Sequence, residues 1–178
     1  EYPFDAAYII KKRKSLKKAL LADGTSRIRK KIAVFGGSTT SDIVKTLELF
    51  LLDAGIEPEF YESEYAQYFQ DAMFPDETLL SFKPDIVFIH TTNRNVTDWP
   101  EMTDTTEQID EKLHTEINRF TAMWKSIAEK FHCPIIQNNF EMPLYRLLGS
   151  RDAWDIHGRT NFLTRLNEAF YAYARENE

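Results

Sequence analysis

Four consecutive hydroxyl side chains, residues 38 to 41, follow two glycines at the end of an apolar run. The stretch reads KIAVFGGSTTSDIV, residues 31 to 44, and passes from strand-type residues into a helical pattern. Gly36 and Gly37 allow the backbone to approach a ligand closely. The first turn of the following helix offers N–H groups that attract an anion or a developing oxyanion. Ser38 would stand at the mouth of such a cradle.

Two roles are open for this segment. In the first, Ser38 is a nucleophile, and Gly36, Gly37 and Thr39 line the binding cradle. In the second, a serine or threonine simply caps the helix, and Asp42 complements its dipole. A serine hydroxyl is almost fully protonated at neutral pH, so the first role also requires a base.

Two asparagines in TTNRN, Asn93 and Asn95, have suitable chemistry for an oxyanion site. A carboxamide can donate a neutral N–H to a carbonyl oxygen as it becomes negatively charged. The same side chains could instead bond their own backbone in an Asx turn. Asn138, in IIQNNFEMP, follows a later apolar run. It is expected to bind ligand at the same edge of the predicted sheet, the rim formed by the carboxyl ends of the strands.

His157 is the best candidate for the base among four histidines, because only it has a nearby carboxylate, Asp155 in RDAWDIHGR. His90 ends a core strand and is interpreted as a satisfied rim residue. Asp110 and His114 have the i, i+4 spacing of a metal-binding pair, but no third ligand is evident. We therefore expect a surface pair and no metal.

Short apolar runs alternate with helical patterns and predict the elements that position these residues. The strands are expected at Ile32–Phe35, Glu59–Tyr61, Asp85–His90 and Pro134–Gln137. Helices are expected near residues 9–21, 43–54, 105–131 and 159–175. Strand and helix in alternation predict an α/β fold with parallel strands and right-handed crossovers. In such sheets ligands bind beyond the carboxyl ends of the strands, where all the candidate loops begin.

Bulk composition favours one globular domain. The chain has 178 residues, of which 43% are apolar and 28% charged, so its composition does not suggest disorder. No apolar run reaches the length of a membrane span, and the first residues lack the order of a signal peptide. Cys133 is the single cysteine and is interpreted as a small core residue, which favours a reducing, cytoplasmic setting.

Charge is unevenly distributed along the chain. Residues 1–31 hold ten Lys or Arg against three acids, +7, and the remainder holds twelve against twenty-five, −13. We expect residues 1–30 to form a basic helical extension that docks on the acidic body, residues 31–178. A phosphate-binding or membrane-surface helix is the alternative. No nucleic acid or membrane partner is expected.

Five segments carry a resemblance to a known family: KIAVFGGSTTSDIV, FYESEYAQY, FKPDIVFIHTTNRNV, IIQNNFEMP and RLNEAFYAYA. The sequence resembles, over residues 4–175, the amino-terminal region of the FkbH-like proteins. In these a domain similar to SGNH (GDSL-type) hydrolases precedes a phosphatase-like domain of the haloacid dehalogenase superfamily, subfamily IIIC. The resemblance implies a three-layer α/β/α sandwich of flavodoxin-like SGNH topology, with a mostly parallel sheet of four or five strands.

The resemblance also implies site residues, with departures. Ser38 resembles the first-block serine and Asn93 the third-block asparagine. Gly37 stands where hydrolases of this class usually have aspartate, and Ser63 stands in the place of the second-block glycine. The fourth block, Asp-x-x-His, is not found. We expect it, a fifth strand and the phosphatase-like domain to lie beyond Glu178.

Three functions follow from these observations. The first is serine esterase or acyltransferase chemistry at Ser38 on a small-molecule or carrier-protein-linked acyl or glycosyl substrate, without a cofactor. The second is an inert accessory domain that positions a carrier-bound or acceptor group. The third is a flavodoxin-like domain whose GGSTTS loop binds the FMN phosphate, with Trp99 stacking on the flavin.

Overall fold

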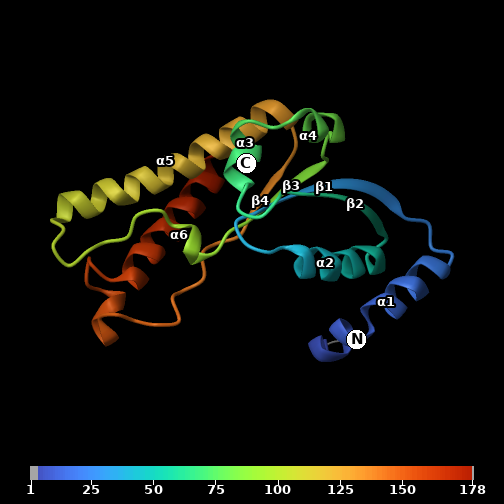
Figure 1. Cartoon of the computed structure of the whole chain (residues 1–178), viewed down its shortest axis with the longest axis horizontal. Coiled ribbons are helices and arrows are strands. Elements are labelled where there is room, and N and C mark those ends of the chain that lie inside the picture. The colour runs from blue at the N-terminus through green and yellow to red at the C-terminus, as the bar shows by residue number, and fades with distance from the viewer. Residues whose placement is uncertain (1–3, 178) are drawn as a thin grey trace.

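The computed structural model describes residues 4–177 and is built around a four-stranded sheet (Figure 1). The elements, in chain order, are α1 (Ala6–Ala22), β1 (Ile28–Gly36), α2 (Ser41–Asp53), β2 (Ile56–Glu62), α3 (Tyr68–Met73), α4 (Glu77–Phe82), β3 (Ile86–His90), the 3₁₀ helix η1 (Asn93–Asn95), α5 (Thr106–Phe131), β4 (Ile135–Gln137), the 3₁₀ helix η2 (Gly149–Ala153) and α6 (Arg159–Glu176).

All strand pairs are parallel, and the strand order is β2-β1-β3-β4. The α/β fold class is therefore confirmed. β1 begins four residues earlier than predicted, because Ile28 already pairs with Ile56 of β2. β3 joins the other edge of β1 only at the pair Ile32–Ile86. The amino end of β1 is thus hydrogen-bonded on one side only.

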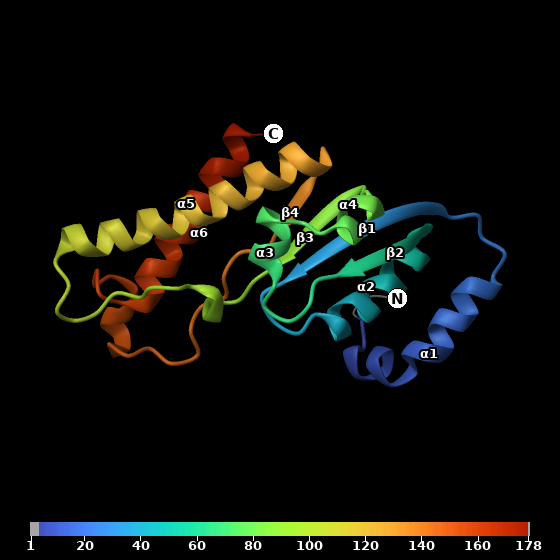
Figure 2. The ribbon, with the colours of Figure 1, turned by 45° about the horizontal axis from the view of Figure 1, so that its top comes forward.

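The two faces of the sheet are covered by different helices, which gives the three layers (Figure 2). Side chains alternate between faces along a strand, so Ala33 and Phe35 pack on the side of α5 and α6, in the larger core. Val34 packs with Val44 of α2 on the other side. On that second side α2 covers β1 and β2, whereas Ile136 of β4 is 53% exposed.

α5 and α6 form the main cover of the sheet. α5 begins at a capping box between Thr105 and Gln108 and ends at His132, which has a left-handed φ of 50°. Its buried stripe includes Ile109, Phe120 and Ile127, all with no exposed surface. Burying each such side chain contributes about 1.5–3 kcal/mol. The sequence did not predict α3 and α4, because six residues each are too few for a helical period to be recognised.

α1 rests on α2, away from the sheet (Figure 1). The rings of Phe4 and Phe50 meet edge to face, with centroids 5.0 Å apart. Arg13 pairs with Asp42 at 3.0 Å and Lys17 with Glu48 at 2.7 Å. No residue of α1 is fully buried, but Ile9, Leu16 and Leu20 are half-buried, so partial apolar burial and these ion pairs accompany the ring contact. Within residues 4–177, no helix combines the length and apolarity needed to span a bilayer.

Candidate functional site

Ser38 and His90 meet at the carboxyl ends of the two central strands. Gly36 and His90 are the last register pair of β1 and β3, and the Gly37 N–H donates to the His90 carbonyl at 2.8 Å. This pairing places the Ser38 hydroxyl 3.4 Å from Nδ1 of His90. Both side chains are half-buried. His90, interpreted from the sequence as a satisfied rim residue, is therefore within hydrogen-bond distance of the candidate nucleophile.

Gly37 is required by a close approach within the protein itself. A Cβ atom at this position would lie 2.6 Å from Cγ of Asn95, far inside van der Waals contact. A side chain at Gly36 would meet Thr40 Cγ2 at the same distance of 2.6 Å. The two glycines therefore allow the end of β1 to pack closely against Asn95 of η1 and against Thr40 in the turn that follows β1. A larger side chain such as aspartate at position 37 would therefore clash with Asn95.

Asn95 holds η1 against the end of β1. Its amide nitrogen donates to the Gly37 carbonyl at 2.9 Å, and its Oδ1 accepts the Thr92 N–H at 2.9 Å. Asn93 is tied elsewhere: its amide nitrogen donates to the Glu141 carbonyl at 3.4 Å, and its own N–H donates to the Glu141 carboxylate at 3.1 Å. Both amide nitrogens thus already donate to backbone carbonyls.

Asn138 joins the ends of β3 and β4. Its Oδ1 accepts the Thr91 N–H and its amide donates to the Thr91 carbonyl, both at 2.8 Å. The amide of Gln137 donates to the Thr91 hydroxyl at 3.0 Å. The side chain of Asn138 therefore extends the strand pairing by two hydrogen bonds, beyond the last backbone pair at Ile89 and Gln137.

The hydroxyls after Ser38 have different surroundings. Thr39 is exposed, and no hydrogen bond of its side chain is found in the described part of the chain. Thr40 is buried and occupies the N-cap position of α2, but its side chain makes no capping bond. Its hydroxyl donates to the Glu62 carboxylate, 3.3 Å away. Helix capping therefore does not account for the hydroxyl-rich turn.

His157 lies in the loop before α6, in contact with the loop before α5. Its Nδ1 is 3.0 Å from the Asp155 carboxylate, and its Nε2 is 3.1 Å from the Asp104 carbonyl. Both ring nitrogens are engaged, and between residues 4 and 177 no hydrogen bond joins His157 to Ser38. The structure pairs His157 with its predicted carboxylate but brings His90 to the serine.

The His157 contacts predict a pH-dependent stability. The hydrogen bond to Asp155, followed by the Asp104 carbonyl, raises the pKa of His157 above its ordinary value. The charged imidazole is therefore more stable folded than unfolded, so its contribution is complete below about pH 6.5 and is lost as the pH rises through the folded pKa. We expect the urea midpoint of His157→Gln to fall below that of the wild type at pH 5.5–6. This deficit should shrink by about pH 9.

His114→Gln is the matched control, because His114 is exposed on α5. Its urea midpoint should follow that of the wild type at every pH. A wild-type advantage over His157→Gln that grows with rising pH would contradict the pKa direction.

The candidate metal ligands Asp110 and His114 are not part of a larger cluster of ligand side chains in the described residues. Among residues 4–177, no three His, Cys, Asp or Glu side chains are grouped as a metal site requires. Asp110 pairs with Arg165 of α6, and His114 is exposed. Cys133 is half-buried next to β4, and burial raises the pKa of its thiol, which disfavours the reactive thiolate.

Comparison with known proteins supports the fold. No family model and no curated protein sequence matches the chain. Among solved structures, the chain is similar to the crystal structure of the N-terminal part of the protein BF1531 from Bacteroides fragilis, described as containing a phosphatase domain complexed with Mg. The TM-score is 0.72 and the identity 20%, over 92% of this chain and 42% of that one. The chain therefore has an α/β fold found in a protein with a phosphatase domain, and it spans less than half of that structure.

Proposed function

We propose that this chain is a non-hydrolytic SGNH-like domain of a larger protein with a phosphatase domain, where it positions an acceptor group. Ser38 and His90 form the polar anchor, and the ligand supplies a hydroxyl or carbonyl oxygen. The single observation behind this proposal is that the Ser38 hydroxyl lies 3.4 Å from His90 Nδ1, while each neighbouring asparagine amide already donates one of its two N–H groups to the backbone.

Acyl transfer would require oxyanion donors that are free and preorganised. One of the two N–H groups of the Asn93 amide donates to Glu141, one of those of the Asn95 amide donates to Gly37, and the Gly37 N–H donates to His90. Giving up any one of these bonds would cost about 0.5–1.5 kcal/mol. The Ser38 N–H, the other oxyanion donor that the resemblance implies, makes no backbone hydrogen bond in the described part of the chain. Within residues 4–177, no carboxylate contacts His90, whereas a catalytic histidine is normally oriented by a third group. Such a rim suits binding better than catalysis.

The wider context follows from two similarities. The solved neighbour is described as containing a phosphatase domain, and the FkbH-like proteins, which the sequence resembles, place a similar domain before a phosphatase-like one. The FkbH-like proteins act in carrier-protein-linked biosynthesis. The acceptor that we propose is therefore a carrier-bound group that the phosphatase-like domain acts on.

Serine hydrolase chemistry is the second candidate, favoured by the same Ser38–His90 contact. Catalytic hydrogen bonds are often long without substrate, so 3.4 Å is compatible with a serine that His90 activates. A flavin phosphate is less favoured, because the Glu62 carboxylate lies 3.3 Å from the Thr40 hydroxyl and would repel it.

A fluorophosphonate probe separates the first two candidates. Without a complete catalytic set, the wild type should react no faster than Ser38→Ala. In parallel, a short thioester mimic of a carrier-bound acyl group should shift the amide NMR signals near Ser38 and His90 in the wild type, and not in Ser38→Ala.

Three variants serve as tests of specificity. Labelling that disappears in both Ser38→Ala and His90→Gln would establish the hydrolase and contradict the proposal. Thr39→Ala is the matched control, because Thr39 is an exposed neighbour with no bond to His90 among the described residues. Absence of both labelling and NMR shifts would contradict a ligand site at this rim.

A further inference from the structure

Some basic side chains of α1 form ion pairs with carboxylates of α2, and others do not. On the side facing α2, Arg13 and Lys17 form ion pairs with Asp42 and Glu48. A second set of residues, here named the outer lysine face, adjoins this side and consists of Ile10, Lys11, Lys14, Lys18 and Leu21, all exposed. Across residues 4–177, none of its three lysines has a carboxylate partner.

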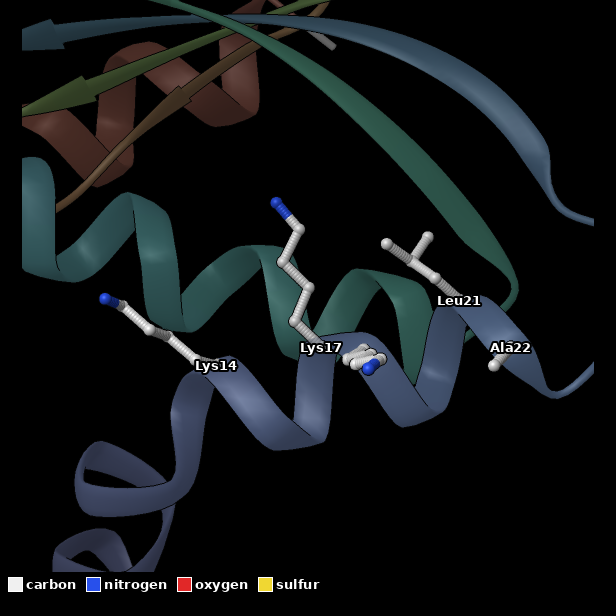
Figure 3. Close-up of a pocket in the computed structure, with 5 residues that line it drawn as sticks. Lys14, Lys17, Leu21 and Ala22 are labelled. Carbon is white, nitrogen blue, oxygen red and sulfur yellow. The ribbon is translucent and has the colours of Figure 1, made fainter.

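The outer lysine face has a regular geometry. Lys11, Lys14, Lys18 and Leu21 follow one another at intervals of three, four and three residues, so they lie along one side of the helix. Figure 3 shows Lys14 and Leu21 rising from the same side of α1 as Lys17, which pairs with Glu48 of α2. A shallow hollow of about 340 Å³ borders this face and is lined by Lys14, Lys17, Lys18, Leu21 and Ala22.

The two ends of the outer lysine face are aliphatic. Ile10 is 63% and Leu21 50% exposed, so two apolar contacts flank the lysines between them. A packed helix with carboxylates in its middle and aliphatic side chains near its ends would complement this pattern in both charge and shape. Lysine stems would also cover part of the partner's apolar surface.

We propose that the outer lysine face of α1 is a docking site for an acidic helix of a partner protein. The helix lies along α1, its carboxylates pair with Lys11, Lys14 and Lys18, and its aliphatic residues contact Ile10 and Leu21. This inference does not depend on the function proposed for the Ser38 rim.

The same features argue against other anionic partners. A bilayer-binding helix needs a continuous apolar face, but here lysines separate Ile10 from Leu21 by more than two turns. Nucleic-acid interfaces extend over large basic areas, and outside residues 1–31 the chain carries a net charge of −13, which repels an extended polyanion. A single helix can contact α1 alone and avoid that repulsion.

A designed acidic peptide tests the docking site on the full chain. The probe is a fluorescein-labelled helix of about 18 residues, matched in length to α1, with glutamates along one side and leucines near both ends. Fluorescence anisotropy at roughly 50 mM salt should show saturable binding that weakens as salt is raised. K14Q/K18Q should weaken binding about five- to tenfold.

Two controls locate the binding. K45Q/K125Q removes the same charge from exposed lysines on α2 and α5 and should leave the affinity unchanged. A probe with glutamine in place of glutamate should not bind. Equal loss in both double variants, or no binding of the acidic probe, would overturn the proposal. So would stronger binding to a DNA duplex, or to vesicles containing about 30% phosphatidylserine, than to the acidic helix.

Discussion

Gly37→Ala is expected to lower the free energy of unfolding by about 2–3 kcal/mol, the range of an overpacked core. The new methyl group would stand 2.6 Å from Asn95 Cγ, so either η1 or the end of β1 must move. Any such shift breaks the hydrogen bond from the Asn95 amide to the Gly37 carbonyl. Urea unfolding measures the loss, and the amide NMR signals of residues 92–96 report the displacement.

Two further variants separate the clash from the loss of a glycine. Gly24→Ala introduces a Cβ with no neighbour within 4 Å, so only backbone strain at φ +74° remains, about 1 kcal/mol. Shortening Asn95 to glycine in the Gly37→Ala background removes the obstructing group and should recover part of the stability. If Gly37→Ala and Gly24→Ala cost the same, the close approach of Asn95 is not what requires glycine.

Glu116→Ala is expected to cost roughly 3–5 kcal/mol, because it leaves a buried charge without its partner. Glu116 has no exposed surface and accepts hydrogen bonds from the Thr97 N–H and from Arg119, each at 2.7 Å. Arg119 also donates to the Asn95 carbonyl at 2.8 Å. Losing the carboxylate therefore leaves the charge of Arg119 with only the neutral Asn95 carbonyl and Tyr68 hydroxyl as partners, and it removes the Thr97 anchor of the loop that carries Asn93. Denaturant unfolding should show the destabilisation together with broadened NMR signals in that loop.

The control lies on the same helix. Glu111→Ala removes an exposed carboxylate from α5 and should change stability by less than about 0.5 kcal/mol. Replacing both Glu116 and Arg119 by leucine removes the unpaired charge, so the double variant should be more stable than Glu116→Ala alone. A Glu116→Ala protein as stable as Glu111→Ala would show that the pair does not hold the loop.

The fold could be predicted from sequence because its signals are local. Apolar runs such as Ile32–Phe35 and Asp85–His90 mark buried strands, and the stripe on α5 has an unambiguous helical period. Their alternation leaves few topologies, and the observed parallel sheet is the expected one. The catalytic and binding roles assigned to the rim residues remain predictions.

The arrangement of the site depends on contacts that no local pattern contains. His90 reaches Ser38 only because β3 is the neighbour of β1 and their last residues are in register. The one available signal was that His90 and Gly36 both end their strands. Asn93 is held by Glu141, 48 residues later, and His157 by Asp104, 53 residues earlier. The carboxylate beside His157 was visible in the sequence, but its distance from the serine was not.

β1 has strand neighbours on both edges at its carboxyl end but on only one edge at its amino end, so the two ends should open at different free-energy costs. The strand starts with β2 alone on one edge and ends between two neighbours, with Gly37 hydrogen-bonded to His90. Local opening needs least energy where fewest backbone bonds must break, so it should begin near Ile28 and reach Phe35 last. The serine–histidine pair therefore sits at the end of the central strand that thermal fluctuations disturb least.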